Sequence, residues 1–349
     1  MKPGAYMRWW DERGGWEPLL SICIPTYRRA ELLRTTLESV LQSARGHEGW
    51  IEIVISDNAS PDHTRQVAEE FAGRWTGLRY HRNETNIGAE RNFYRAVELT
   101  RSQYVWILGD DDLIATQFFE QLQPRLSEKP DLVICNHSIY NRDFSYLHRR
   151  SFLPANAVSR FDDRDDIMAT FGASLGFISA LVFRRQDFFN VPRADYEHFA
   201  NVGFSFLFTI YAMLGQPCHV AYIAEPLILN RGGNSPMPDW ERSFVDGIAL
   251  VFAELARRGY SARALVRAKT LALRNYVLKY ALNARIAAPP ATVLAVRLRH
   301  YYADCSYYWL VIRPLWLVPP VVLRVMRGSS RKARQLWRRA PITAKALPS

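Results

Sequence analysis

Short apolar runs rich in β-branched residues alternate with segments of helical periodicity over the first third of the chain. The runs expected to form strands are 19–24, 51–56, 78–82, 104–108 and 131–135. Between them, apolar residues recur every three or four positions, as in 30–42 and 113–122. Strands that alternate with helices of this length are typical of βαβ units. The pattern therefore predicts an α/β domain with a mostly parallel, covered central sheet.

Beyond residue 135 the periodicity is less regular. The pattern indicates a polar, irregular segment over 136–176, a strand within 176–185, an apolar helix over 203–214, and a strand, a turn and a second strand over 219–235. After about residue 238 only helical segments follow. We therefore expect an N-terminal extension (1–18), an α/β domain (19–237) and a C-terminal helical region (238–349).

Polar, turn-rich sequences follow the first four expected strands. They read "PTYRR", "DNASPDHT", "NETNIG" and "GDDD". In a parallel sheet the carboxyl ends of the strands meet at one edge, and ligands bind in the crevice beyond that edge. We therefore expect these four loops to form the functional site.

The last of these loops contains three consecutive aspartates, Asp110, Asp111 and Asp112. One interpretation is that they begin a helix over 113–122, because carboxylates cap free backbone N–H groups and favour the positive end of the helix dipole. The other is a divalent cation, because adjacent carboxylates repel each other unless something positive neutralises them.

The charge is unevenly distributed. The chain of 349 residues has a net charge of +11, and no acidic residue follows Asp304. This asymmetry indicates an anionic partner, either a membrane surface or a nucleic acid. The four cysteines are far apart, which favours buried free thiols in a reducing compartment. The first 20 residues contain no apolar stretch of signal-peptide length, so we do not expect secretion.

Several classes of nucleotide-dependent protein are disfavoured by missing motifs. No strand is followed by G-x-x-x-x-G-K-[ST], and the first strand is not followed by G-x-G-x-x-G. These absences argue against P-loop phosphoryl transfer and against the usual dinucleotide-binding fingerprint. A phosphatase of the haloacid-dehalogenase type would carry paired aspartates after its first strand, where this chain has "PTYRR".

The ordered motifs resemble family 2 glycosyltransferases, the inverting nucleotide-sugar enzymes with a GT-A fold. The segments that carry the resemblance are "SICIPTYRRAELLRTTLESVL", "IEIVISDNASPDHT", "NETNIGAERNFYRAV" and "YVWILGDDDLI". The later "FISALVFRR" and "AEPLILNRGGNS" are similar to O-antigen abequosyltransferases and related deoxyhexosyltransferases. The resemblance extends from about residue 19 to 235. It implies a Rossmann-like, nucleotide-diphospho-sugar transferase domain.

The resemblance also implies a reaction. A sugar would move from a UDP-, dTDP-, GDP- or CDP-sugar to a hydroxyl of a glycan or of a polyprenyl-diphosphate-linked saccharide, with inversion. The setting would be bacterial surface polysaccharide synthesis, such as O-antigen, capsule or exopolysaccharide. An alternative is a catalytically impaired module that still binds nucleotide sugars.

Carried onto this sequence, the resemblance implies a set of donor-binding residues. After the first three strands these are Pro25, Thr26, Tyr27, Asp57, Asn58, Asn86, Gly88 and Arg91, and near the end of the domain Arg231. For three of these residues, a purely structural role is the alternative. Gly88 fits a turn residue with positive φ, and Arg91 and Arg231 fit solvent-facing positions.

The aspartates correspond to the metal-binding D-x-D region of the family, which implies Mg²⁺ or Mn²⁺. Many members carry the first aspartate where this chain has Gly109. If the backbone stays extended, alternation places Asp110 and Asp112 on one face, so we expect these two to hold the metal. We expect Asp110 also to bind the donor, and Asp111 to contact either the ribose of the donor or the metal.

The general base is the point where the sequence departs from the family. Many members carry a Glu-Asp pair at the start of a helix for which this chain reads "NVGFSFLF". The nearest ionisable candidates for a base are Glu197 and His198. A solvated loop position is the alternative for both.

The segment 305–340 is apolar and aromatic, then strongly basic, and its apolar part is interrupted by Arg313 and by Pro314, Pro319 and Pro320. An arginine near the middle makes a spanning helix costly, whereas an interfacial anchor on anionic lipid accommodates it. We therefore expect a cytoplasmic protein, peripheral on the inner face of the cytoplasmic membrane. An ordinary helical subdomain is the alternative. No nucleic-acid-binding motif accompanies the basic residues.

Overall fold

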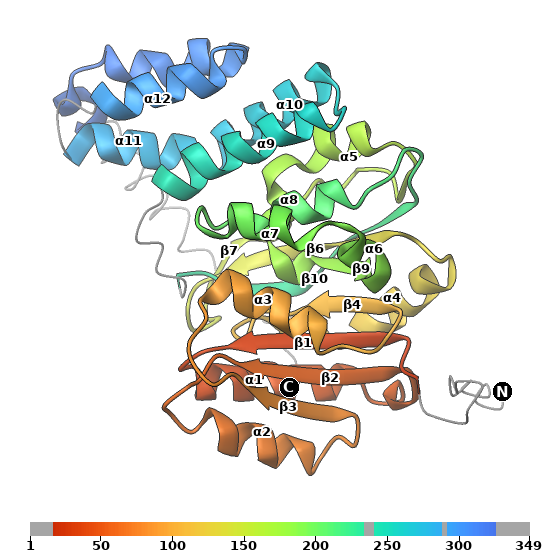
Figure 1. Ribbon diagram of the computed structural model, residues 1–349. Coiled ribbons are helices and arrows are strands. Elements are labelled where there is room, and N and C mark those ends of the chain that lie inside the picture. Colours follow the sequence, from red (N-terminus) through yellow and green to blue (C-terminus); the bar gives the residue numbers. More distant parts are fainter. Residues whose placement is uncertain (1–16, 234–240, 288–291, 326–349) are drawn as a thin grey trace. The chain divides into compact units, whose positions relative to one another are not determined.

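The computed structural model describes residues 17–233, 241–287 and 292–325. Contacts divide the chain into two compact units (Figure 1). Unit 1 consists of residues up to Ile167 together with Ser174–Pro236, and unit 2 consists of Met168–Ala173 together with the chain from Met237. The boundaries expected from the sequence for separate functional domains stay predictions.

The first four strands of unit 1 form the parallel part of the sheet. They are β1 (Leu20–Thr26), β2 (Ile51–Asp57), β3 (Leu78–Arg82) and β4 (Tyr104–Ile107). Their order in the sheet is β3-β2-β1-β4, and each neighbouring pair is parallel. The carboxyl ends of all four strands therefore lie at one edge, as the pattern predicted.

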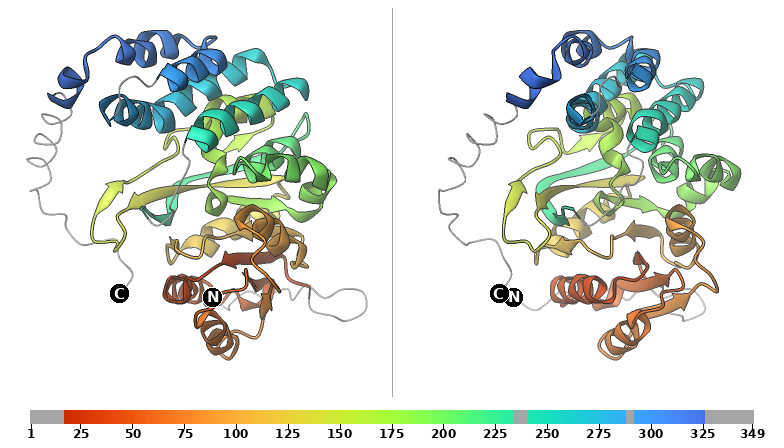
Figure 2. Two further views of the ribbon diagram at one scale, coloured as in Figure 1. Left: turned by 60° about the vertical axis from the view of Figure 1, so that its left-hand side comes forward. Right: turned by 90° about the vertical axis from the view of Figure 1, so that its left-hand side faces the viewer.

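Helices connect these strands and cover both faces of the sheet. They are α1 (Ala30–Ser43), α2 (Thr64–Ala72), α3 (Ala89–Glu98) and α4 (Phe118–Ser127). Figure 2 shows that α1 and α3 lie on opposite faces of the sheet. The strands β1, β2 and β4 are buried along their whole length, which explains why they read as continuous apolar runs.

Beyond β4 the sheet contains both parallel and antiparallel strand pairs, in the order β4-β9-β6-β10-β5. The strands are β5 (Leu113–Ile114), β6 (Leu132–Tyr140), β9 (Leu181–Arg184) and β10 (Val220–Arg231). β9 is antiparallel to both of its neighbours, whereas β6 and β10 are parallel to each other. Two short strands at the margin are β7 (Leu147–Arg149) and β8 (Arg160–Phe161).

The prediction of an irregular segment over 136–176 is wrong in its first part, because the strand β6 continues to Tyr140. Asn136 is completely buried, yet its side chain is fully bonded to backbone and hydroxyl groups. Its amide donates to the carbonyl of Ala224 (2.9 Å), and its oxygen accepts from the backbone of Leu153 (2.9 Å). A buried polar side chain that is satisfied in this way costs little, so a polar sequence here continues a core strand. The segment also contains β7, β8 and α5 (Arg164–Phe171).

The expected strand, turn and second strand over 219–235 are instead one strand, β10. It carries a bulge around Pro226, where its register against β6 shifts twice. Proline has no N–H to donate to a neighbouring strand, so a bulge is where a strand tolerates it. The turn signal in the sequence therefore marks a bulge and not the end of a strand.

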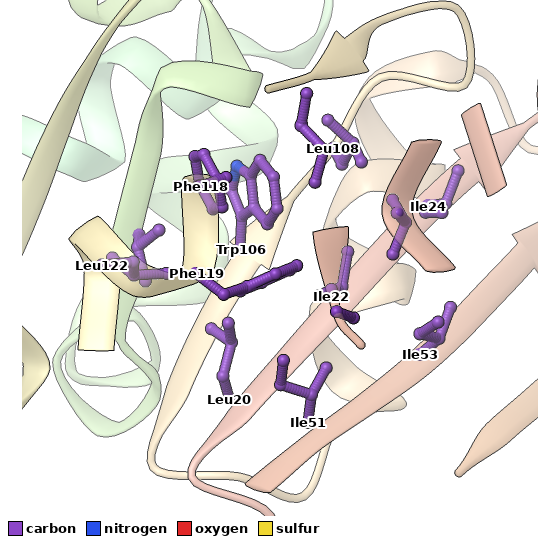
Figure 3. Packing of buried hydrophobic residues seen from close by; sticks show 14 of the residues in the cluster. Leu20, Ile22, Ile24, Ile51, Ile53, Trp106, Leu108, Phe118, Phe119 and Leu122 are labelled. Atoms are coloured by element: carbon purple, nitrogen blue, oxygen red, sulfur yellow. The ribbon is translucent and has the colours of Figure 1, made fainter. Parts of the chain in front are cut away.

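One core cluster fills the space between the sheet and the helices α1 and α4 (Figure 3). Ile22 of β1 and Ile53 of β2 lie in this cluster on adjacent parallel strands. Trp106 of β4 stacks on Phe118 of α4, with ring centroids 4.4 Å apart, and its indole N–H donates to the carbonyl of Ser179 (2.7 Å). The strand that leads to the acidic triplet is thus held by apolar packing and by buried side-chain hydrogen bonds, which include that of the Trp106 indole.

The part of unit 2 that the structure describes after residue 237 is helical, as the pattern predicted. Its helices are α9 (Ile248–Arg257), α10 (Ala262–Ala272), α11 (Leu278–Ala287) and α12 (Thr292–Tyr302), with π-helical turns η4 (Glu241–Gly247), η5 (Leu273–Val277) and η6 (Tyr308–Ile312), and the 3₁₀ turn η7 (Arg313–Trp316). A second core, which includes Val277, Leu298 and Ile312, lies among them. Among the described residues, no helix is both long enough and apolar enough to cross a bilayer.

Replacing Trp106 by alanine should lower the free energy of unfolding by about 3–5 kcal/mol, because the change leaves a large cavity beside Phe118. Trp106→Phe keeps an aromatic ring at this position but removes the hydrogen bond to Ser179, so we expect a smaller loss. Urea denaturation followed by circular dichroism measures both. A loss below about 1 kcal/mol for the alanine variant would contradict the packing described for β4.

Candidate active site

The loops after β1 and β4 meet at the predicted edge of the sheet. The hydroxyl of Thr26, the last residue of β1, donates a hydrogen bond to Asp110 Oδ2 (2.7 Å). Arg29, in the same loop, donates to Asp110 Oδ1 (3.0 Å) and to Asp111 Oδ2 (3.2 Å). Arg29 therefore bridges two adjacent carboxylates. Sequence reasoning did not assign it a role, although it stands in the polar loop "PTYRR".

The triplet does not cap a helix, so that interpretation is wrong. The helix expected over 113–122 begins only at Phe118, with Gln117 as its N-cap residue. Leu113 and Ile114 instead form β5, which pairs with β10. The extended pairing of these two residues separates the carboxylates from the helix start.

Asp112 is held from two other parts of unit 1. It is 1% exposed, and its Oδ2 accepts a hydrogen bond from the hydroxyl of Ser179 (2.6 Å). Its Oδ1 accepts from the side-chain amide of Asn230 (2.9 Å) and from the backbone N–H of Arg231 (3.2 Å). Ser179 and Asn230 are functional residues that sequence reasoning missed. The sequence feature that could have pointed to them is a polar residue inside an apolar run, which is Ser179 in "FISALVF" and Asn230 in "LILNR".

Gly109 leaves little room for a side chain. A Cβ atom there would lie 3.0 Å from Asp112 Oδ2 and 3.3 Å from Ser179 Oγ. The backbone N–H of Gly109 also donates to Ser179 Oγ (3.0 Å). In this chain the space beside Gly109 is therefore filled by the hydrogen bond between Ser179 and Asp112.

Burial raises the pKa of two of the three carboxyl groups. The pKa of Asp110 rises to about 6, with Arg29 opposing the shift, and that of Asp112 rises to about 7, with the charge of Asp111 adding to the effect. A raised pKa means that the ionised form is disfavoured. The triplet therefore holds more negative charge than its surroundings stabilise, which is the condition that a bound cation relieves.

Arg231, at the end of β10, lies against the triplet. Its Nε donates to the backbone carbonyl of Asp111 (3.0 Å), and one terminal nitrogen donates to the carbonyl of Arg142 (2.7 Å). The guanidinium also lies 4.4 Å from the ring centroid of Phe144. These contacts fix a positive charge beside the aspartates, so Arg231 is not a freely solvated strand-end residue.

A second polar cluster lies at the ends of β2 and β3. Asp57 is buried, and its carboxylate accepts from the backbone N–H of Ser60 (2.9 Å) and from the hydroxyl of Tyr80 (2.6 Å). Arg82 lies 3.7 Å from the same carboxylate. Tyr80 and Arg82 were not identified from the sequence, because alternation within "LRYHR" does not show which side chain turns towards β2.

Asn58 connects this cluster to the loop before α3. Its amide donates to Asn86 Oδ1 (2.8 Å) and to the carbonyl of Gly88 (3.3 Å), and its oxygen accepts from the backbone N–H of Ile87 (3.0 Å). Gly88 has a φ of +86°, which agrees with the expected turn residue. The structure therefore brings the predicted residues Asn58, Asn86 and Gly88 together.

The predicted donor contact Arg91 and the base candidate Glu197 form an ion pair, with Arg91 Nε 2.9 Å from Glu197 Oε2. Glu197 also lies 3.9 Å from Arg193. In this structure the carboxylate of Glu197 is therefore paired with the guanidinium of Arg91. His198 is exposed on α7 (Arg193–Ala200), where its ring contacts Phe199. The two base assignments stay predictions.

The remaining predicted residues lie at the end of β1. Pro25 is aligned with Ser56 on β2, and Tyr27 is exposed just after the strand. Their roles as pocket residues stay predictions.

The oxygen atoms of the triplet suit a metal ion that is held partly by the protein and partly by a bound ligand. Among the described residues, no group of three or more His, Cys, Asp and Glu side chains is arranged to hold a metal ion by itself. Mg²⁺, however, is commonly bound by one or two carboxylates together with water and substrate phosphates. Two desolvated carboxylates with raised pKa values are a suitable protein contribution to such a site.

Comparisons with solved structures agree with this architecture. S. aureus TarS superposes with a TM-score of 0.57 at 14% identity, over 89% of this chain and 91% of that chain. The mannosyltransferase PcManGT from Pyrobaculum calidifontis superposes with a TM-score of 0.53 at 17% identity, over 93% of this chain and 89% of that chain. The fold is therefore that of the GT-A nucleotide-sugar transferases, as the resemblance implied.

Sequence comparisons find similarity to known glycosyltransferases. Residues 21–190 match the glycosyl transferase family 2 model. Abequosyltransferase RfbV of Salmonella typhimurium is 28% identical over 258 residues, which cover 70% of this chain and 76% of that protein. The putative glycosyltransferase EpsH of Bacillus subtilis is 26% identical over 60% of each chain. Residues 21–190 of this chain are therefore similar to glycosyl transferase family 2.

The buried charge of Asp112 should make the stability of the protein depend on pH. Its pKa is about 7 in the folded protein and about 4 in an unfolded chain, so between these values the folded state binds more protons. Stability therefore falls as the pH rises from about 4 to 7. Asp112→Asn removes the charge, and the Ser179 hydroxyl can accept a hydrogen bond from the new amide. Without divalent cations, we expect the variant to have a higher Tm than the wild type at pH 8, and no advantage at pH 5.

Thermal melting at the two pH values measures this difference. Asp162→Asn is the matched control, because the Asp162 side chain is exposed and pairs with Arg160 at the surface. A wild-type protein that is at least as stable as Asp112→Asn at pH 8 would show that the carboxylate is not destabilised by its burial.

Proposed function

We propose that the protein transfers a hexosyl or deoxyhexosyl group from a nucleoside-diphosphate sugar to a hydroxyl of a glycan or lipid-linked saccharide, with inversion and with the help of Mg²⁺ or Mn²⁺. The observation that carries the proposal is the acidic triplet, partly desolvated and flanked by Arg29 and Arg231, at the edge of a GT-A sheet. The likeness to an abequosyltransferase supports bacterial surface polysaccharide synthesis as the setting.

Binding of the nucleotide is assigned to the cluster around Asp57 and Asn58. Both side chains are fixed by several hydrogen bonds, which positions their groups before a ligand arrives. Preorganisation of this kind lowers the entropy lost on binding. Among proteins of similar fold, a structure of S. aureus TarS contains UDP-GlcNAc, and the structure of PcManGT contains GDP-Man with Mn²⁺. The choice among nucleotides is a matter for experiment.

Leaving-group stabilisation is assigned to the triplet and to its two arginines. Asp110 and Asp112 are the expected metal ligands, and the half-buried Asp111, which shares Arg29 with Asp110, is the third candidate. A divalent cation bound there would stabilise the charge that develops on the departing diphosphate. Arg231 adds a fixed positive charge on the same side of the aspartates.

A catalytically impaired binding module is the second candidate. It is favoured by one observation, which is that residues 201–208 contain no acidic side chain. The two candidates differ in a simple way, since a binding module would bind sugar nucleotides without releasing nucleoside diphosphate.

An anionic membrane surface is the proposed location of the acceptor. Apart from Tyr27 and Val158, the exposed large hydrophobic side chains of the described chain all lie in unit 2, and they include Leu310 and Leu317, which are 77% and 76% exposed. Arg313 lies against the ring of Trp309 in the same segment. Exposed apolar side chains beside arginines suit the headgroup region of anionic lipid. The enzyme would then share the plane of a lipid-linked acceptor, peripheral on the cytoplasmic side of the membrane.

Donor binding is tested by thermal shift with UDP-glucose, UDP-GlcNAc, GDP-mannose, dTDP-glucose and CDP-glucose, each with and without Mn²⁺. A donor at a hundredfold excess over its Kd should stabilise the protein by about 2.7 kcal/mol. We expect a shift that requires Mn²⁺. Asp110→Asn, Asp111→Asn and Asp112→Asn each remove one carboxylate, and the variants that lose the Mn²⁺-dependent part identify the ligands.

Glu38→Gln is the matched control for these variants, because Glu38 pairs with Arg74 on the surface. It should leave the shift unchanged. If all three triplet variants keep the full Mn²⁺-dependent shift, the triplet is not the metal site.

Membrane binding is tested by sedimentation with vesicles of phosphatidylglycerol and phosphatidylcholine. The double variant Leu310→Glu with Leu317→Glu should weaken binding at least about tenfold, because it removes two apolar contacts and adds two like charges facing anionic lipid. Val158→Glu, an exposed valine of unit 1, is the control and should bind as the wild type does. Equal binding by the double variant and the wild type would exclude this surface as the anchor.

A further inference from the structure

Glu90 places a carboxylate at the start of a second helix. It stands in the first turn of α3, directly after the Gly88 turn, and its side chain is half-buried. The carboxylate lies beside the hydroxyl and backbone N–H of Ser205 and beside the backbone N–H of Phe206. Ser205 and Phe206 are the first two residues of α8 (Ser205–Ala212). A side chain from one helix thus supplies a negative charge to the start of another.

The contact between these two side chains is incomplete. Glu90 Oε2 and Ser205 Oγ are both buried, and neither makes a hydrogen bond of normal geometry in the described part of the chain, although the hydroxyl and backbone N–H of Ser205 lie close enough to the carboxylate to stabilise its charge in part. Buried polar atoms are normally paired, because leaving one unpaired costs about 1–3 kcal/mol. Two unpaired oxygens side by side, one an acceptor and one able to donate or accept, are complementary to a hydroxyl group.

The position of Glu90 is fixed by its neighbours on α3. Asn92, two residues further along, accepts a hydrogen bond from the hydroxyl of Ser56 (2.9 Å) and donates to the Ser56 carbonyl (2.9 Å). The hydroxyl of Tyr196 donates to the backbone carbonyl of Glu90 (2.7 Å). The start of α3 is therefore tied to β2 on one side and to α7 on the other.

The start of α8 is connected to the acidic triplet by a short segment. Phe204, the N-cap residue of α8, lies against Gly176, where a Cβ would be 3.3 Å from its ring. Three residues later, Ser179 donates its hydroxyl to Asp112. At the other end, the carbonyl of Gly88 accepts from Asn58 in the nucleotide cluster. The segments that carry Glu90 and Ser205 are thus each linked to one part of the proposed donor site.

The hydroxyl of Ser205 and the backbone N–H groups of Ser205 and Phe206 stabilise the charge of Glu90, but less than burial disfavours it. On α7, Tyr196 is the titratable neighbour, and its own pKa is raised by burial and by Glu90. Arg91 is paired with Glu197, and Arg193 also lies near Glu197. Burial raises the pKa of Glu90 to about 7, and the neighbouring groups of Ser205 and Phe206 oppose the shift. A carboxylate with a pKa near 7 is well matched to accepting a proton at neutral pH.

We propose that Glu90 is the general base of the transfer, and that Ser205 positions the acceptor hydroxyl against it. In the step, the acceptor oxygen bonds to the anomeric carbon of the donor, and the bond from that carbon to the β-phosphate oxygen breaks. The electron pair leaves with the nucleoside diphosphate, and the hydroxyl proton passes to the Glu90 carboxylate. Residues 201–208 need no acid of their own in this arrangement, because α3 supplies it. The inference rests on the proposed sugar transfer.

The test measures nucleoside-diphosphate release from the five sugar nucleotides used for thermal shift, with Mn²⁺ and with water as the acceptor. Glu90→Gln keeps the size of the side chain but cannot take up a proton. We expect kcat to fall about 10²–10⁴-fold, while the donor KM changes less than about threefold. With saturating donor and Mn²⁺, which keep the triplet ionised, kcat of the wild type should rise with pH and level off above about 7, and the variant should lose this rise.

Two further variants separate a base from a structural contact. Glu98→Gln, on the same helix and paired with Arg95 at the surface, should keep both the rate and the pH profile. Glu90→Asp keeps a carboxylate on a shorter side chain, so it should retain part of the rate with a shifted rise. If Glu90→Gln fails to fold, an unshifted rise in Glu90→Asp, or a flat wild-type profile, overturns the inference.

The outcomes distinguish this inference from the proposed function. If none of the five sugar nucleotides shifts the wild-type Tm, the proposed function fails. If a donor binds but no nucleoside diphosphate is released, the binding module is correct and Glu90 is not a base. If release is observed and Glu90→Gln keeps more than about a tenth of kcat with an unchanged pH profile, Glu90 is not the base. Loss of the rise in Glu197→Gln or in His198→Asn instead would assign the proton to that residue.

Discussion

The hydrogen bonds to Asp112 are the constraint on which the site depends. They join the loop after β4 to Ser179, ahead of β9, and to Asn230 and Arg231 at the end of β10. These segments are distant in the sequence, and the buried carboxylate joins them in addition to the pairing of β4 with β9 and of β5 with β10. Burying that carboxylate is unfavourable unless its oxygens are bonded, so the three segments are held together by the need to satisfy it. Arg231 and the backbone of Asp111 take their places as a result.

The same principle orders the cluster around Asp57 and Asn58. Asp57 and Asn58 end a strand that is buried on both faces, and their polar atoms are satisfied by Ser60, Tyr80 and the loop that contains Asn86. Each cluster is built from residues that a free chain would solvate separately. In the fold they hold one another in fixed geometry, which leaves a rigid edge made of short loops. A rigid edge is suited to positioning a charged, flexible donor, because little further ordering is needed when it binds.

Much of this architecture follows from local patterns. The strands β1, β2 and β4 are uninterrupted apolar runs, and their parallel order places the predicted loops on one edge. β6 was predicted only in part, because Asn136 and its polar neighbours read as a loop until their partners are known. The helix expected after the triplet starts late, because Leu113 and Ile114 pair with residues more than a hundred positions away. Arg29, Ser179 and Glu90 were missed for the same reason, since their partners are set by tertiary packing and not by spacing in the sequence.

The bulge in β10 has a consequence for the site. Between the pairs Ile223 with Cys135 and Ile228 with His137, β10 advances five residues while β6 advances two. The surplus is three, and an odd surplus exchanges which alternate residues of β10 lie on each face relative to its partner strand. Asn230 lies beyond this point and turns its amide towards Asp112. The bulge at Pro226 thus shifts the alternation of side chains along β10 by one position. This shift determines on which face of the sheet the residues at the end of the strand lie, Asn230 among them.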